Sequence, residues 1–221
     1  SIDVRWTLLS ANETATHMPA TGISGVDLYV KASGRWRFVG NGRPLGVTNR
    51  STFGMPPGEQ YLLYLPLYNG VKSVEIGVPK GRTLAACNLA QPRKPIVFYG
   101  TSITQGGCAS RPGMAFTAIV GRRLEMPVVN LGFSGCGKME PQMAELLAEL
   151  DPAVYVLDCL ANMSPQMVAE RVEPFVRTLR QTRRNTPILL AEDSSFRNIC
   201  PTEKGRVLRA VYEKLKGDGI E

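Results

Sequence analysis

The chain has 221 residues, of which 43% are hydrophobic and 20% are charged, a composition typical of a folded protein rather than a disordered or fibrous one. Its formal net charge of +7 comes from basic residues scattered along the sequence without a nucleic-acid-binding motif, so no nucleic-acid partner is expected. No apolar run approaches the roughly 20 residues of a membrane-spanning helix, so no membrane span is expected.

Residues 1–82 alternate between apolar and polar side chains. Ile2, Val4, Trp6 and Leu8 lie on one face of such a pattern, and Val26, Leu28 and Val30 on one face of another. Turn residues separate these runs, including Ser33-Gly34 and Asn69-Gly70, and Asn-Gly between two such runs is typical of a hairpin. The pattern predicts a small antiparallel β-sandwich.

The pattern changes after a connector. Residues 83–95 end in Gln91-Pro-Arg-Lys-Pro95, which has the polar, proline-flanked character of a domain linker. Residues 96–221 then alternate short apolar runs with helix-like stretches, which predicts a parallel sheet with helices on its faces. The strands are expected at 96–99, 127–131, 153–157 and 187–191, and the helices near 114–124, 139–150, 164–182 and 203–216.

The second domain is expected to continue beyond the residues given. Gly219-Ile220-Glu221 leads out of the last predicted helix as a turn into a fifth strand would. We therefore expect the sequence to be truncated within this domain.

Three loops follow the first three predicted parallel strands and would meet at one edge of the sheet. The first presents Ser102 and its backbone N–H, the second contains Gly135, and the third offers the side-chain amide of Asn162. We expect Gly135 to let its N–H approach a substrate oxygen closely, because glycine has no Cβ. Two N–H groups and one amide directed at a developing oxyanion would stabilise the transition state of acyl transfer. Ser102, Gly135 and Asn162 are the predicted catalytic residues.

These residues resemble the blocks of the SGNH (GDSL-like) hydrolases. Gly100-Thr-Ser-Ile-Thr104 is similar to the first block, with Thr101 in place of the usual aspartate, and Leu160 and Met163 replace the glycine and aspartate around Asn162. Gly25-Val-Asp-Leu-Tyr29 resembles the GxDLY signature of a β-sandwich that precedes certain SGNH esterase domains. The resemblance implies a flavodoxin-like three-layer α/β domain after the sandwich, and a serine esterase acting on acyl groups such as acetyl groups of carbohydrates. It implies no metal or organic cofactor.

The general base is the missing part of this mechanism. A serine hydroxyl needs a base to take its proton, and the usual base is histidine. The chain has one histidine, His17, which the sequence places in a loop or at a strand edge of the β-rich half. The resemblance implies an Asp-x-x-His block after a fifth strand, beyond Glu221.

Several alternatives stay open at this stage. Gly132-Phe-Ser-Gly-Cys-Gly-Lys138-Met139 is close to a P-loop, but Met139 stands where a Ser or Thr would bind magnesium. Neither Ser102 nor Ser134 fits the G-x-S-x-G elbow of α/β-hydrolases. The sandwich could instead bind carbohydrate beside an inactive hydrolase domain. The acyl and alcohol specificity, the oligomeric state, the pairing of the five cysteines and the compartment, secreted or periplasmic among others, are undetermined.

Overall fold

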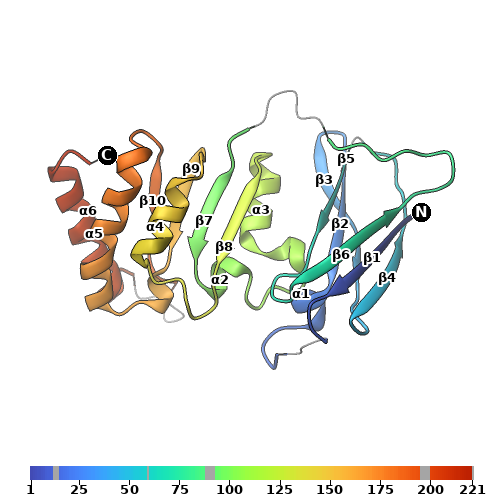
Figure 1. The fold of residues 1–221 in the computed structure, drawn as a ribbon, viewed down its shortest axis with the longest axis horizontal. Helices are drawn as coiled ribbons and strands as arrows, with labels where there is room; N and C mark the ends of the chain where they lie inside the picture. The colour runs from blue at the N-terminus through green and yellow to red at the C-terminus, as the bar shows by residue number, and fades with distance from the viewer. Residues whose placement is uncertain (12–14, 59, 88–92, 195–199, 221) are drawn as a thin grey trace. The chain divides into compact units, whose positions relative to one another are not determined.

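The computed structural model describes residues 1–11, 15–58, 60–87, 93–194 and 200–220. These residues form two compact units, each with its own core (Figure 1). One unit takes residues 1–92 together with 106–122, and the other takes residues 93–105 together with 123–221. Within the expected linker 83–95, residues 88–92 lie outside the described residues, and the remainder has no helix or strand.

The first unit contains two antiparallel sheets, with strand orders β4-β1-β6 and β3-β2-β5. Its elements are β1 (Ile2–Leu8), α1 (Ala20–Ser24), β2 (Val26–Ala32), β3 (Arg35–Gly42), β4 (Thr48–Phe53), β5 (Gln60–Tyr64) and β6 (Val71–Gly77), followed within 106–122 by η1 (Pro112–Met114) and most of α3 (Phe116–Leu124). Alternate residues of β1 and β2, including Val4, Trp6 and Leu28, meet in one apolar core between the sheets. The predicted antiparallel sandwich is confirmed.

The hairpin predicted at Asn69-Gly70 is wrong. The strands on either side, β5 and β6, belong to different sheets. Gly70 does not have the positive φ that a two-residue type I′ turn requires. Instead, the Asn69 side chain hydrogen-bonds Ser10 and Ser24, and its backbone N–H donates to Ile23 O at 3.0 Å. Asn69 thus fixes a crossover between sheets, which local sequence does not distinguish from a hairpin.

Both faces of strand β2 are buried, although its alternation resembles that of a half-exposed strand. Leu28 points into the sandwich core, whereas Asp27 and Tyr29 face the segment 106–122 on the other side of the sheet. Asp27 is completely buried and accepts hydrogen bonds from the Arg111 guanidinium at 2.9 Å and from Gly113 N–H at 2.8 Å. The GxDLY residues therefore hold this later segment on the sandwich.

The second unit contains a parallel sheet that is four-stranded over the described residues. Its elements are β7 (Ile96–Gly100), α2 (Ser102–Gln105), β8 (Val128–Gly132), α4 (Pro141–Ala148), β9 (Val154–Asp158), η2 (Leu160–Asn162), α5 (Pro165–Thr182), β10 (Ile188–Leu190) and α6 (Glu203–Gly217). These bounds match the predicted strands and helices to within two or three residues. The start of α5 is capped by Ser164, whose hydroxyl accepts from Met167 N–H, and the start of α6 is capped by Thr202 in the same way.

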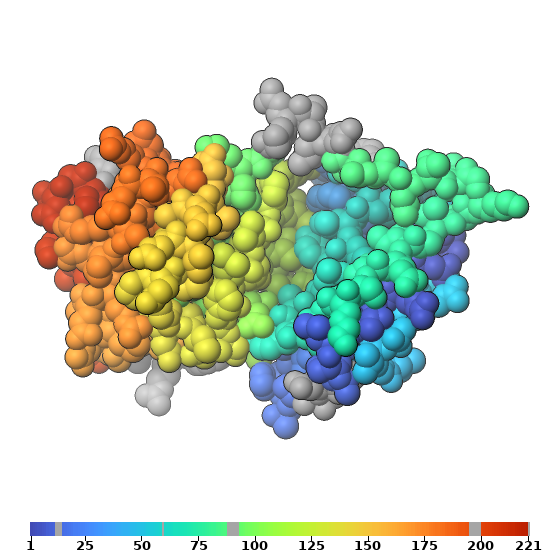
Figure 2. All heavy atoms as spheres, in the orientation of Figure 1, coloured from blue at the N-terminus to red at the C-terminus, as the bar shows by residue number. Residues whose placement is uncertain are grey.

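The sheet has the order β10-β9-β7-β8, which is the flavodoxin-like order for four parallel strands. Val97 and Tyr99 of β7, with Tyr155 and Leu157 of β9, pack into one core with apolar residues of α4, α5 and α6. These helices lie on one face of the sheet, and in Figure 2 the atoms of α4 and α5 cover that face. The predicted parallel α/β domain preceded by a sandwich is confirmed.

Helix α6 ends in the expected glycine turn. Gly219 has a φ of +73°, and Ile220 N–H donates to Leu215 O at 2.9 Å, as in a Schellman cap. Within the described sheet β10 pairs only with β9. A fifth strand beside β10 stays a prediction.

Candidate active site

The strand order places a topological switch point at the carboxyl end of β7. The chain passes from β7 to its neighbour β8 on one side, and then to β9 on the other side, so the loops after β7 and β9 lead away from each other. In open α/β sheets this switch point is where ligands bind. Gly100 is level with Gly132 of β8 and with Asp158 of β9, so the three strands end together. The loops that begin there carry the three predicted catalytic residues.

Ser102 is the first residue of α2, two residues beyond the end of β7, and it is half-buried. The turn before it is closed by Thr101, whose carbonyl accepts from Gln105 N–H and whose hydroxyl accepts from Ile103 N–H. Thr101 is thus the N-cap of the short helix, a position where aspartate and threonine are both favoured. This capping role explains how Thr101 can stand where the SGNH block has an aspartate, just before Ser102.

The second loop is folded tightly against the end of β7. Phe133 N–H donates to Gly100 O at 3.0 Å, and Ser134 N–H donates to the Gln105 side chain at 3.0 Å. A Cβ on Gly137 would lie 2.0 Å from Gly100 O, so only glycine fits there. Gly137 is a position in the loop that the sequence analysis did not select, and its place in the G-x-G spacing after Gly135 was the available signal.

Gly135 is exposed at the tip of this loop and has a φ of +73°. A Cβ at Gly135 would meet nothing within 4 Å among the described residues, so the conformation, rather than crowding by the protein, requires glycine. In the part of the chain that the structure describes, its N–H donates to no backbone carbonyl. The direction of this N–H relative to a substrate stays a prediction.

Asn162 ends the 3-10 turn η2 after β9. Its side-chain amide donates to Gly137 O at 3.4 Å and to Phe133 O at 3.5 Å, which are long hydrogen bonds. Leu160 and Met163, which depart from the family pattern on either side of it, are buried in the core. The structure thus brings Asn162 onto the loop of Gly135, and it joins that loop to the Ser102 turn through Gly100 and Gln105.

Lys204 of α6 contacts the turn that carries Asn162. Its Nζ donates to Leu160 O at 2.7 Å and pairs with Asp193 at 2.6 Å. The sequence analysis did not select either residue, because they follow the fourth strand and meet the third loop only in the folded chain.

Asp158 and Thr104 link β9 to α2. The Thr104 hydroxyl, which is fully buried, donates to Asp158 Oδ2 at 2.7 Å. Burial raises the pKa of Asp158, and repulsion from Asp193 raises it further, although the hydrogen bond from Thr104 opposes the shift. This pair fixes α2 against the sheet two residues beyond Ser102.

His17 lies exposed in a turn between Ala15 and Met18 of the first unit, as the sequence predicts. The five cysteines all lie in described residues, and each is a free thiol. Over the described residues the structure contains no helix long and apolar enough to cross a membrane.

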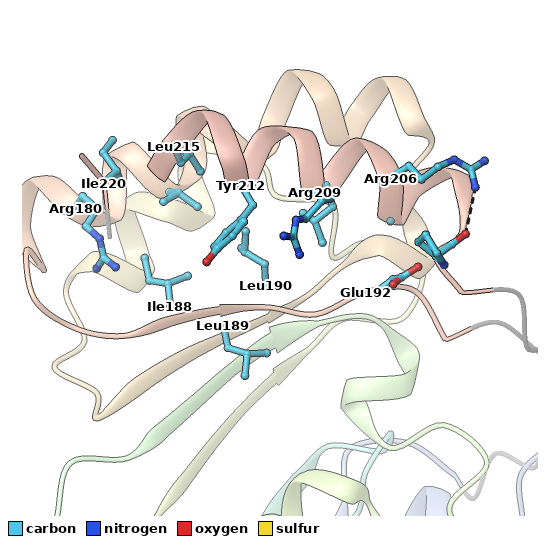
Figure 3. Close-up of a pocket in the computed structure, with 14 residues that line it drawn as sticks. Arg180, Ile188, Leu189, Leu190, Glu192, Arg206, Arg209, Tyr212, Leu215 and Ile220 are labelled. Carbon is cyan, nitrogen blue, oxygen red and sulfur yellow. Dashed lines mark hydrogen bonds between the residues drawn. The ribbon is translucent and has the colours of Figure 1, made fainter. Parts of the chain in front are cut away.

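A cavity of about 670 Å³ lies between α6 and β10, away from the predicted catalytic residues (Figure 3). Tyr212 and Leu215 of α6 face Ile188 and Leu190 of β10 across it, and the polar lining residues include Arg180, Arg206, Arg209 and Glu192. None of Ser102, Gly135 and Asn162 lines this cavity. It lies beside the edge of the sheet where a further strand would pair.

The fold and the three loops define a hydrolase of the SGNH type. The chain belongs to the GDSL-like lipase/acylhydrolase family, whose model matches residues 93–215. Residues 1–84 match the GxDLY model, described as the N-terminus of SGNH-hydrolase-type esterases. This membership places the chain among the esterases and acylhydrolases.

Several solved structures are similar to the chain. A protein assigned as a GDSL-like lipase from Bacteroides ovatus is 35% identical, with a TM-score of 0.86 over 100% of this chain and 68% of that one. The salicylyl-acyltransferase SsfX3 of a tetracycline biosynthetic pathway is 20% identical, with a TM-score of 0.76 over 100% and 65%. A family two carbohydrate esterase from Clostridium thermocellum, in complex with cellohexaose, is 14% identical, with a TM-score of 0.66 over 98% and 74%. A search of the curated proteins finds no match.

Proposed function

We propose that the protein is a serine esterase that removes acyl groups, such as acetyl groups of carbohydrates, through an acyl-enzyme on Ser102. The observation that carries the proposal is the meeting of the Ser102, Gly135 and Asn162 loops at the switch point of the sheet. A serine in a strand-end loop is usually a turn residue, and it is the other two loops that favour a nucleophile here.

In the proposed mechanism Ser102 Oγ attacks the ester carbonyl carbon, and its proton passes to a general base. The N–H groups of Ser102 and Gly135 and the amide of Asn162 donate to the oxyanion of the tetrahedral intermediate. The alcohol leaves with the proton from the base, and water then attacks the acyl-enzyme in the same manner to release the acid.

We propose that the base is a histidine beyond Glu221, oriented by an aspartate three residues before it. One fact supports this: the two first-named similar proteins are longer, since this chain spans 68% and 65% of them. A parallel strand added at β10 would carry such a block to the carboxyl edge of the sheet, where Ser102 lies.

A carbohydrate ester fits the openness of the site. Ser134, Gly135, Cys136 and Ala161 are exposed, so a bulky alcohol portion can remain in solvent while the acyl group enters. Exposed apolar side chains border the same loops at Ile103 and Phe133 and could contact a short acyl chain. The similarity in fold to a carbohydrate esterase adds support for this substrate class.

The carbohydrate-binding alternative receives less support from the sandwich. The two exposed aromatic residues of its described strands, Phe38 and Tyr61, pair with adjacent residues of β2 and so lie on opposite faces of the sheet. The Arg111 guanidinium lies 3.9 Å from the Phe38 ring centroid and covers one face of that ring. Two aromatic rings on opposite faces of a sheet do not form one stacking surface for a sugar.

The first prediction tests the nucleophile and the base together. The 221-residue chain should hydrolyse an aryl acetate poorly, because an enzyme without its base keeps only about a 10³–10⁴-fold acceleration over water. A chain extended past a fifth strand and the loop that follows it should be faster by about 10² or more, and Ser102→Ala should remove that gain. Steady-state hydrolysis of the three proteins provides the measurement.

Ser134→Ala in the extended chain is the matched control and should keep the gain, since Ser134 is an exposed serine on the neighbouring loop. An extended chain that is as inactive as the short one would refute the esterase proposal. Sugar binding without turnover would support the carbohydrate-binding alternative, and binding of ATP would revive the P-loop interpretation.

A further inference from the structure

The loop that carries Gly135 needs support, because residues 133–136 are exposed. An oxyanion donor accelerates a reaction only if its N–H is held in place before the charge develops. The contacts of Phe133 and Gly137 fix the beginning and middle of the loop. Its far end, where the chain enters α4, is held by a different set of side chains.

Tyr99 is the central residue of this second set. It is completely buried in β7, three residues before Ser102, and its ring stacks on Phe175 with centroids 5.5 Å apart. Its hydroxyl donates to Glu140 Oε2 at 2.8 Å and accepts from Met139 N–H at 3.2 Å. A tyrosine in the nucleophile's own strand therefore binds the end of the oxyanion loop.

Glu140 completes the arrangement. Its Oε2 also accepts from Lys138 N–H at 3.1 Å, and the Lys138 carbonyl accepts from the Arg171 guanidinium at 3.0 Å. Although burial raises the pKa of Glu140, the hydrogen bonds from Tyr99 and Lys138 and the charge of Arg171 lower it below its usual value. Burial raises the pKa of Tyr99, so the pair is a neutral phenol donating to a carboxylate.

The backbone of the loop shows that these contacts determine its shape. Met139 has a φ of +54°, which is unfavourable for a residue with a side chain, and that side chain is buried in the core. Such a conformation persists only where the surroundings impose it. The N–H of Met139 on Tyr99 and the buried Met139 side chain provide that constraint.

We propose that Tyr99 and Glu140 are positioning residues that hold the Gly135 loop in the conformation required for the oxyanion. The inference rests on the proposed esterase function for its catalytic consequence, but its structural consequence can be measured in the chain itself. Neither residue contacts substrate in this scheme; both act through the backbone of residues 138–140.

The test is Tyr99→Phe, with Tyr155→Phe as the matched control. Tyr155 is also completely buried, lies on the adjacent strand in the same core, and donates its hydroxyl to Leu147 O and Leu150 O, away from the Gly135 loop. Each variant loses one buried hydroxyl, so their general effects on stability should be similar.

Hydrogen exchange of the 221-residue chain is the first measurement. We expect the amides of residues 134–139 to exchange at least about tenfold faster in Tyr99→Phe than in the parent and at parental rates in Tyr155→Phe. Glu140→Ala should behave like Tyr99→Phe. Glu140→Gln should be milder, because its carbonyl oxygen can still accept a hydrogen bond, and these two variants decide the matter if Tyr99→Phe does not fold.

Kinetics of whichever chain shows Ser102-dependent turnover is the second measurement. Tyr99→Phe should lower kcat by about 10- to 100-fold with little change in KM, whereas Tyr155→Phe should change neither. Equal exchange in the two tyrosine variants, or a loosened loop with unchanged kcat, would overturn the inference. Absence of any Ser102-dependent turnover would instead refute the proposed function, with the exchange result still deciding whether Tyr99 holds the loop.

Discussion

Glycine occupies positions 135 and 137 for two different physical reasons. Gly135 has a φ of +73° and open space around its Cα, whereas Gly137 packs so closely on Gly100 O that a Cβ would lie 2.0 Å from it. Conformational strain can be absorbed locally, but a collision with a backbone carbonyl at the end of β7 has to move the loop or the strand. Substitution should therefore be tolerated better at Gly135 than at Gly137, although both positions are glycine.

This difference predicts the outcome of two alanine substitutions. Gly135→Ala should lower the free energy of unfolding by about 1–2 kcal/mol, the cost of a left-handed residue with a side chain. Gly137→Ala should cost more, about 3 kcal/mol or above, and should also reduce turnover by displacing the Asn162 contact. Denaturant unfolding of both variants provides the comparison, and equal stability of the two would contradict the close packing of Gly137.

At the scale of elements, β9 and α2 are joined by the hydrogen bond between the Asp158 carboxyl group and the Thr104 hydroxyl. Burial makes this carboxyl group harder to ionise than it is in the unfolded chain. A raised pKa of Asp158 means that the folded protein holds this proton more tightly than the unfolded chain does. Its contribution to stability is therefore lost as the pH rises from the ordinary value of 3.8 through the raised value. Glycine packing and this pair together fix where α2 begins.

The pH dependence can be tested with Asp158→Asn. The asparagine carbonyl can still accept from Thr104 but does not titrate, so the variant should lose less stability than the parent as the pH rises above 3.8. Asp151 is the control, since hydrogen bonding to Lys94 lowers its pKa and places its effect below pH 3.8. Asp151→Asn should leave the interval above about pH 4 unchanged. Parallel pH profiles for Asp158→Asn and the parent would contradict the prediction.

At the scale of the whole molecule, one unit is discontinuous in sequence. Residues 106–122 belong to the sandwich unit, yet they follow α2 directly in the chain. Asp27 binds Arg111 and Gly113, and the Arg122 guanidinium lies 4.2 Å from the Tyr29 ring centroid. The GxDLY residues thus bind a segment, 106–122, that comes from the hydrolase part of the sequence. This favours a sandwich that is an integral part of the protein over one that folds independently.

This organisation predicts unequal effects of one substitution in two contexts. In the whole chain Asp27→Asn should destabilise by about 3 kcal/mol or more, because it breaks a buried ion pair. In a fragment of residues 1–92, which lacks the segment that covers Asp27 and pairs with it, the same change should alter stability by about 0.5 kcal/mol or less, since the ion pair and the cover are both absent. Thermal unfolding measures both. A fragment that unfolds cooperatively at the temperature of the whole chain would contradict the role assigned to residues 106–122.

The sequence by itself predicted the elements and selected the candidate residues of the site. The change from period two to alternating strands and helices predicted both kinds of sheet, because burial of one face or two imposes those patterns. Ser102, Gly135 and Asn162 could be selected because each follows a recognisable apolar run. Capping by Ser164 and Thr202 was equally local and kept the helix bounds close to those predicted.

Only the tertiary structure decided which segments meet. The Asn69-Gly70 crossover, the burial of Asp27 under Arg111 and the contact of Tyr99 with Glu140 each join residues that local sequence treats independently. The strand order that places β7 between β8 and β9 is likewise set by packing of α4, α5 and α6 over the whole sheet. Local sequence patterns indicate how much of a residue is buried, but not which residues bury it. The support of the candidate active site depends on those partners.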